Sequence, residues 1–152
     1  MPSASSEPET KRVPTTDGVA LYARPGEENE ALESQLKLIA PYVTKARSTY
    51  PDARGRYLAG LPAGARFFVS ALLTDEAGHG EFVFIQVDSI ADGTIHGRLD
   101  SELYVVSGYQ RGQKMQIREA DILDWTISTA DGREEGNFVG KFVESMSAGS
   151  AP

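Results

Sequence analysis

The chain has 152 residues, no cysteine and a formal net charge of −7, and these properties exclude several classes of protein. Without cysteine there is no disulfide, no thiol nucleophile and no thiolate metal site, which fits a reducing compartment and leads us to expect a cytoplasmic protein. The acidic balance, with a pI near 4.8, opposes non-specific nucleic-acid binding, which neutralises phosphates with Lys and Arg, and no apolar run approaches the roughly 18 residues of a membrane span.

Both ends of the chain are expected to be disordered, with one domain between them. Residues 1–12 are polar, hold two prolines and have neither the basic nor the apolar region of a secretory signal. Residues 145–152 have a similarly small and polar composition. A single domain over residues 13–144 fits the length, and its patterns divide it into a helical part, 26–61, and a β part, 66–144.

The helical part follows a short expected strand over residues 17–23. Apolar residues recur every three or four positions from Leu32 to Ala46, the pattern of one face of an amphipathic helix. Pro41 interrupts this run, and proline removes an amide donor and clashes with the preceding turn. We therefore expect a kink or two short helices meeting there, and a further short helical segment over residues 51–58.

The β part contains six or seven short apolar runs separated by turn residues every eight to twelve positions. The expected strands are 66–73, 81–88, 94–99, 103–106, 114–117, 123–128 and 137–142. Both alternating faces of the run 82–87 are mostly apolar, which indicates a strand that is covered on both sides. Together the two parts predict an α+β fold, with N-terminal helices packed on a small barrel or strongly curved sheet of about six strands.

Catalytic motifs are missing from the sequence. It has no nucleophile elbow, no phosphate-binding glycine loop and no His-Glu-x-x-His helix. A metal site would need His79 and His96 to meet a carboxylate, and nothing in their spacing enforces that. Asp121 and Asp124 are interpreted as turn-capping and turn-anchoring residues. We therefore expect no catalytic residue, no cofactor and no metal ion, and we favour a protein that is not an enzyme.

Trp125, the only tryptophan, has two possible roles. It shares an apolar face with Leu123 and Ile127, because residues two apart in a strand point to the same side, and this favours a core position. The alternative is an aromatic side chain at the mouth of a groove, because tryptophan combines a large contact area with a hydrogen-bond donor. The candidate contacts for a ligand or partner are Trp125, Asp124, Tyr104, Tyr109, Glu102, Glu134 and Glu135.

A basic strip interrupts the acidic background between residues 45 and 66. It consists of Lys45, Arg47, Arg54, Arg56 and Arg66. Against these five cations stands only Asp52, so the segment carries a local charge of +4 and the rest of the chain carries −11. The favoured interpretation is a solvated helical face. The alternative is a binding site for a phosphate or an acidic partner. Nucleic-acid binding is a weaker alternative, because the surrounding negative charge repels phosphates.

Several short motifs over residues 44–144 together carry a family resemblance. They are Lys45-Ala-Arg-Ser-Thr-Tyr-Pro51, Phe67-Phe-Val69, the run 82–87, Gly97-Arg-Leu99, Arg111-Gly-Gln113, Ile122-Leu-Asp-Trp125, Asp131-Gly132 and Gly136-Asn-Phe138. In this order they resemble the bacterial YegJ-like family, domain of unknown function 2314. The chain departs from the family at Gln113, where Asp is usual, at Ser101-Glu102-Leu103, where Asn-Glu-Pro is frequent, and at Thr126, where Met is frequent. The resemblance implies an α+β fold with an SH3-like curved sheet and no established reaction, so no functional residue is carried over.

These observations favour a non-catalytic module that binds another protein. One version is an immunity-type protein whose acidic surface masks a basic partner, because charge complementarity accelerates association and sets specificity. The alternative is a small-ligand protein or an enzyme with a pocket near Trp125, at the junction of the helices and the sheet. The sequence predicts neither the identity of the partner nor the oligomeric state.

Overall fold

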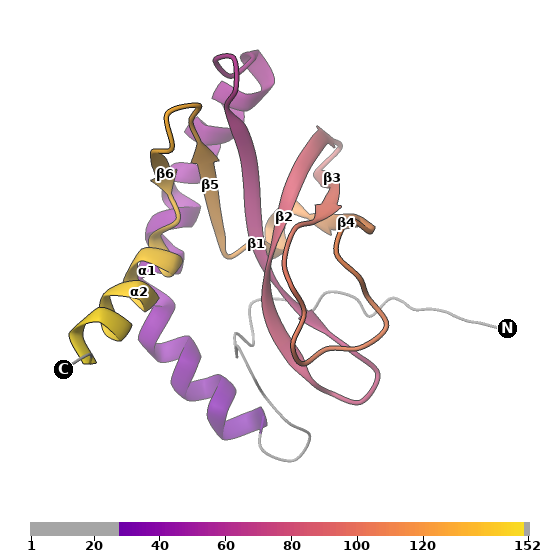
Figure 1. Cartoon of the computed structure of the whole chain (residues 1–152), viewed down its shortest axis with the longest axis vertical. Helices are drawn as coiled ribbons and strands as arrows, with labels where there is room; N and C mark the ends of the chain where they lie inside the picture. The colour runs from indigo at the N-terminus through magenta and orange to yellow at the C-terminus, as the bar shows by residue number, and fades with distance from the viewer. Residues whose placement is uncertain (1–27, 151–152) are drawn as a thin grey trace, which may run out of the picture.

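The structure is a computed structural model that describes residues 28–150, with side chains placed for residues 34–146. In chain order its elements are α1 (Glu28–Ala59), β1 (Arg66–Thr74), β2 (Gly80–Ala91), β3 (Thr94–Leu99), β4 (Lys114–Arg118), a single 3-10 turn (Glu119–Asp121), β5 (Asp124–Ser128), β6 (Glu134–Gly136) and α2 (Phe138–Ser150). Figure 1 shows the two helices on one side of the strands. The combination of helices with an antiparallel sheet confirms the predicted α+β class.

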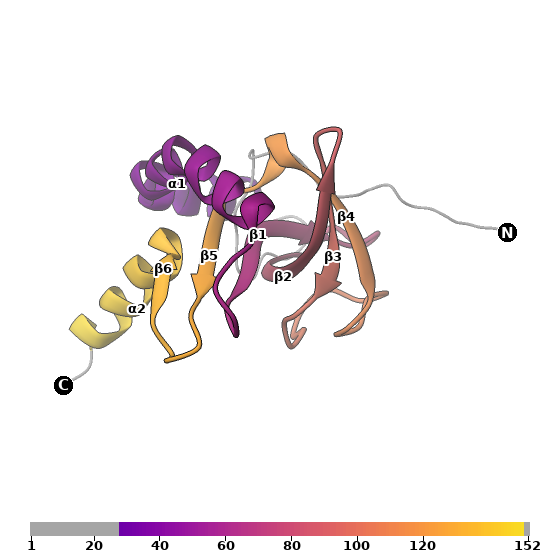
Figure 2. The ribbon, with the colours of Figure 1, turned by 90° about the horizontal axis from the view of Figure 1, so that it is seen from above.

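The six strands form one open antiparallel sheet in the order β4-β3-β2-β1-β5-β6. The chain therefore starts at the centre of the sheet, builds outward through β2, β3 and β4, and returns to the other side of β1 with β5 and β6. A bulge in β2 between Val87 and Ser89 increases the local twist. Figure 2 shows the strands changing direction from β5 to β4, with α1 along one side.

The larger core lies between α1 and the inner face of the curved sheet. Alternate residues of β1, from Phe67 to Leu73, point into it, as the strand period requires. Ala46, Tyr50 and Ala53 come from α1 at spacings of four and three, so they share one helical face. Every one of these residues is buried, and their burial fixes α1 across the sheet.

A second core lies on the outer face of the sheet. Its buried members are Ile39, Leu72, Leu123 and Val139, which come from α1, β1, the position just before β5, and α2. Phe82 of β2 packs against this cluster, whereas its neighbour Val83 belongs to the inner core. The expectation that this strand is covered on both sides is therefore confirmed at this end of β2.

Helix α1 differs from the expected pair of short helices. It runs without interruption through both Pro41 and Pro51, although its ribbon bends along its length in Figure 1. Contacts on both sides of Pro41 hold the two halves in line, since Ile39 and Ala46 are each buried against the body of the protein. Tertiary packing thus overrides the local cost of proline. The expected strand over residues 17–23 and the expected disorder of residues 1–12 lie outside the described residues.

Two of the expected strands are wrong. Residues 103–106 belong to an irregular loop, because the N–H groups of residues 104–106 donate to the side chain of Glu81 instead of a neighbouring strand. All of residues 137–142 except Asn137 lie in helix α2, which runs from Phe138 to Ser150 and so extends into the segment 145–152 that was expected to be a tail. Gly136 and Asn137 have φ values of 78° and 54°, and this left-handed pair turns the chain out of β6 and into the helix.

Candidate binding groove

A groove of about 370 Å³ lies on the outer face of the sheet, where α1, β2 and α2 meet. Its apolar lining consists of Ile39, Phe82, Phe84, Val139 and Val143. Phe82 and Phe84 are two residues apart and therefore share the outer face of β2, with their rings edge to face at 6.2 Å. Val139 and Val143 are four residues apart and share one face of α2. The two periodicities, one from a strand and one from a helix, create a single apolar surface.

Two carboxylates lie at the edge of this groove, and no Lys or Arg of the described residues lines it. Glu134 and Glu144 are both exposed, and neither forms an ion pair within the described part of the chain. One carboxylate oxygen of Glu134 accepts a hydrogen bond from the side-chain amide of Asn137 at 3.0 Å. Within the described residues, the ammonium of Lys141 donates to the main-chain carbonyl of Glu134, at 3.2 Å, and not to its carboxylate. The groove therefore combines an apolar interior with a negative edge.

Asp124 fastens the α2 wall of the groove to the sheet. Its side chain is fully buried, and its two oxygens accept the N–H groups of Val139 at 2.7 Å and Trp125 at 2.8 Å. Val139 lies in the first turn of α2, where N–H groups lack partners within the helix, so the carboxylate acts as a helix cap supplied by another element. Burial raises the pKa of Asp124 to about 6, against the opposing effect of the N–H groups that it accepts.

Three buried polar atoms around Asp124 have no hydrogen-bond partner among the described residues. They are Ser70 Oγ, Thr126 Oγ1 and Asn137 Oδ1. Ser70 lies opposite Asp124 in the β1–β5 pairing, and Thr126 is the next residue on the same face of β5. Asn137 follows Gly136, which pairs with Thr126. Buried polar atoms normally have a hydrogen-bond partner. A further hydrogen-bond donor beneath the start of α2 would therefore be favourable.

Trp125 occupies a core position. Only 6% of its surface is exposed, its indole N–H donates to Thr49 Oγ1 at 2.9 Å, and its ring meets Phe138 edge to face at 5.9 Å. It lines neither the groove nor the larger cavity at the end of α1. Trp125 thus joins α1, β5 and α2 from the inner side of the sheet, on the face opposite Asp124.

The structure separates the other predicted contact residues. Tyr104, Tyr109 and Glu102 lie in the loop between β3 and β4, where Glu102 pairs with Arg111 and the hydroxyl of Tyr109 donates to the Thr74 carbonyl. Of the seven candidate residues, only Glu134 lines the groove, and Asp124 supports its wall. Sequence reasoning missed the apolar lining, although the shared face of Phe82 and Phe84 was a signal for it.

The basic strip is largely occupied within the chain. Arg54 donates to Glu119 at 2.5 Å, and Arg56 forms a two-pronged pair with Glu135 at 2.8 and 3.0 Å. Arg47 donates to the main-chain carbonyls of residues 120 and 122 at 3.2 Å. Lys45 lies 5.4 Å from the ring centre of Phe138, and Arg66 lines a separate cavity. Most of the strip therefore fastens α1 to the segments before β5 and after it.

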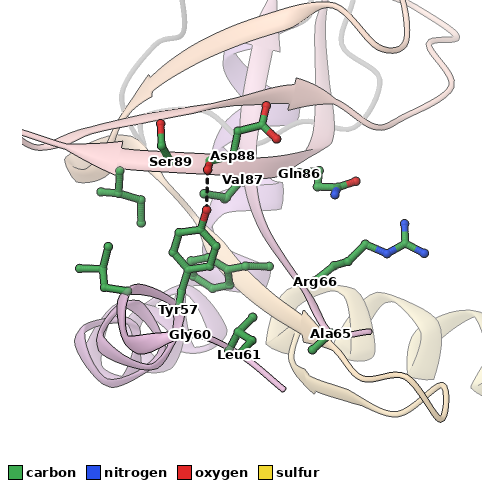
Figure 3. Close-up of a pocket in the computed structure, with 12 residues that line it drawn as sticks. Tyr57, Gly60, Leu61, Ala65, Arg66, Gln86, Val87, Asp88 and Ser89 are labelled. Atoms are coloured by element: carbon green, nitrogen blue, oxygen red, sulfur yellow. Dashed lines mark hydrogen bonds between the residues drawn. The ribbon is translucent and has the colours of Figure 1, made fainter. Parts of the chain in front are cut away.

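That separate cavity, of about 520 Å³, lies at the C-terminal end of α1. Figure 3 shows the side chain of Tyr57 crossing it from the helix to β2, where the hydroxyl donates to the main-chain carbonyl of Asp88 at 2.7 Å. The carboxylate of Asp88 is already paired with Arg98. Because Tyr57 spans this cavity, the groove between α1, β2 and α2 is the better candidate site.

No family model, no curated protein and no solved structure matches the chain. Among the described helices none is long and apolar enough to cross a bilayer. Over the same residues, no group of three or more His, Asp or Glu side chains is placed to hold a metal ion.

Proposed function

We propose that this chain is a non-catalytic binding module, and that the groove receives an apolar side chain flanked by Lys or Arg from a protein partner. The observation that carries the proposal is the pairing of an apolar lining with two carboxylates, Glu134 and Glu144, that have no cationic partner among residues 34–146. Burial of an apolar side chain supplies affinity, and opposite charges at the edge orient the partner and accelerate encounter. The net charge of −7 acts in the same direction.

The state of Asp124 supports a binding role over a catalytic one. Displaced pKa values often mark catalytic carboxylates. Asp124, however, is fully buried, and both of its oxygens already accept main-chain N–H groups. A general acid or base must come within hydrogen-bond reach of the substrate, and full burial keeps this carboxylate away from the protein surface.

An immunity-type protein in a bacterial cytoplasm, which masks a basic partner, is the version of this function that we favour. We also propose that the chain belongs to the YegJ-like family and that its curved sheet is SH3-like. The motif residues Asp124, Trp125 and Phe138 lie together where α2 joins the sheet, and that proximity is what a shared structural motif requires. The internal pairing of Arg54 and Arg56 weakens the nucleic-acid alternative.

A small apolar ligand is the second candidate for the groove. Its volume of about 370 Å³ falls within the range of small-molecule pockets, roughly 300–1,000 Å³. Native mass spectrometry of the protein purified gently from its own cells separates the two candidates. A bound small mass would favour the ligand, and a bound protein would favour the interaction module.

The test of the groove uses a phage-displayed library of random 12-residue peptides selected on the immobilised protein. We expect selected peptides to place an aliphatic or aromatic residue next to Lys or Arg. The double variant Glu134→Gln/Glu144→Gln should bind a selected peptide at least about tenfold more weakly, because it keeps the shape of the edge and removes its charge. Glutamine at position 134 also keeps an acceptor for Asn137.

The matched control is Asp52→Asn/Asp92→Asn, which removes two exposed carboxylates outside the groove. Both double variants change the net charge from −7 to −5. Any difference between their affinities for the peptide is therefore due to the position of the carboxylates and not to the total charge. Equal weakening by the two double variants, or selected peptides without basic residues, would overturn the proposed role of the groove.

A further inference from the structure

The connection between β3 and β4 is long and irregular, yet it is firmly held. It spans the 14 residues Asp100–Gln113 without helix or strand. Loops of this length in a compact domain are uncommon and are usually functional or disordered. Its first turns are tied to β2, because Asp100 donates its N–H to the Phe84 carbonyl at 2.8 Å and Ser101 Oγ accepts the Phe84 N–H at 2.9 Å.

Two carboxylates from outside the loop fix its central backbone. Glu81, which is only 4% exposed, accepts the N–H groups of Tyr104, Val105 and Val106 at 2.9 to 3.1 Å. The next N–H group, that of residue 107, donates to Asp75 at 2.9 Å. Four consecutive N–H groups are thus bound, and the buried side chain of Val106 adds a contact with the core. The order of this loop comes from charge-assisted hydrogen bonds instead of a strand pairing.

Tyr104 is the residue that this fixed backbone displays. Its surface is 73% exposed, although its own N–H lies 3.2 and 2.9 Å from the two oxygens of Glu81. A large aromatic side chain on a fixed backbone loses little conformational entropy when it binds, since only its two side-chain torsions must be ordered. Tyrosine is also among the residues that carry most of the binding energy in protein interfaces.

The surroundings of Tyr104 are acidic. Glu102 is 67% exposed and Asp100 is 35% exposed at their side chains, and the two share the single guanidinium of Arg111. Glu76 lies exposed in the β1–β2 turn, which borders the same loop at residues 107–109. The area around Tyr104 is therefore net negative, and a partner surface that fits it must be positive.

We infer that Tyr104 is a preformed anchor that inserts into an apolar pocket, edged by Lys or Arg, on a protein partner. The inference rests on the proposed function in treating the chain as a protein-binding module, but it does not depend on the groove. Both surfaces are built on β2, because Phe84 lines the groove with its ring and holds the start of the loop with its main chain. The loop itself packs on the inner core through Leu103 and Val106, so the groove and Tyr104 are two separate surfaces.

The test replaces Tyr104 with the photoreactive residue p-benzoyl-L-phenylalanine in the full chain, expressed in the cells from which the protein comes. The control places the same residue at Leu58, which is 52% exposed near the end of α1. We expect one discrete protein adduct from position 104 that is absent from position 58. The captured protein is identified by mass spectrometry, purified and titrated against wild type, Tyr104→Ala and Tyr104→Phe.

Tyr104→Ala should weaken binding by about 30-fold, the size expected of an interface hot spot, whereas Tyr104→Phe should stay within about threefold of wild type because it keeps the ring. Absence of an adduct specific to position 104, or equal affinity of Tyr104→Ala and wild type, would overturn the inference. Titration of Glu134→Gln/Glu144→Gln against the same protein separates the two surfaces. A loss with Tyr104→Ala alone supports the anchor as a surface separate from the groove, and a loss with the groove variant alone contradicts the anchor.

Discussion

Asp124 links the sheet to the α2 wall of the groove, and this requires a carboxylate to be buried. Its carboxylate caps α2, but full burial disfavours its charged form and raises its pKa from 3.8 to about 6. The native state therefore holds this proton more tightly than the unfolded state does. The resulting stabilisation is fully present below pH 4 and is lost as the pH rises through about 6.

We expect the free energy of unfolding to contain a component from Asp124 that falls by up to about 3 kcal/mol between pH 4 and 7, since one pKa unit corresponds to about 1.4 kcal/mol. Urea unfolding of wild type and Asp124→Asn across this range measures it. Carboxylates with lowered pKa values, such as Asp75 and Glu135, contribute the opposite slope in both proteins, so the difference between the two curves isolates Asp124. Parallel curves would show that Asp124 does not titrate in this range.

The packing of helix α2 depends on Asn137, the residue that precedes it. Gly140 lies in its first turn, and a Cβ atom added there would lie 2.2 Å from Asn137 Oδ1 and 2.8 Å from Asn137 Cγ. The amide of Asn137 is fixed by Glu134, and its main-chain N–H donates to the Trp125 carbonyl at 2.7 Å, so it has little freedom to move. This glycine is therefore required by close packing.

We expect Gly140→Ala to destabilise the protein by about 1–3 kcal/mol, as overpacking of a filled site does. The matched control is Gly55→Ala in α1, where an added Cβ atom meets nothing within 4 Å. Alanine should there stabilise by about 0.5–1 kcal/mol, because glycine lowers helix stability by that amount. Thermal and urea unfolding of both variants gives the comparison, and equal effects of the two substitutions would contradict the packing of Gly140 against Asn137.

The elements that the sequence predicted correctly are those with local signals. Apolar runs bounded by turn residues are sufficient to identify β1 and β2, and a stripe of apolar residues identifies the helix before Ala46, although not the continuity of α1 through Pro41 and Pro51. The loop at residues 103–106 was predicted as a strand because Val105 and Val106 favour strands. Their N–H groups are instead bound by Glu81, more than 20 residues earlier in the chain.

The start of α2 was missed for a similar reason. Phe138, Gly140 and Phe142 alternate as they would in a strand, and the cap that selects the helix comes from Asp124 on β5. A second signal was present, because Phe138-Val139 and Phe142-Val143 repeat at four residues, the spacing of a helical face. The groove depends on this helix, so most of its lining could not be predicted from the sequence.

At the scale of the whole molecule, the basic residues of α1 are used mainly to hold the fold. Arg54 and Arg56 face Glu119 and Glu135, whereas Glu134 and Glu144 at the groove have no such partners in the part of the chain that the structure describes. Long-range attraction depends on all the charges together, but short-range contact depends on the carboxylates that touch the partner. The first is measured by the association rate and the second by the dissociation rate.

Glu134 and Glu135 separate these two effects, because they are adjacent in β6 and differ in their partners. Glu134→Gln and Glu135→Gln each change the net charge from −7 to −6, so both should slow association with a groove-selected peptide to a similar extent at low salt. Only Glu134→Gln should accelerate dissociation, by severalfold, because Glu135 faces Arg56 of α1 and not the groove. Surface plasmon resonance at two salt concentrations measures both rates. Faster dissociation from Glu135→Gln would place the peptide against α1 and β6, and the binding surface would then have to be moved from the groove to that side of the sheet.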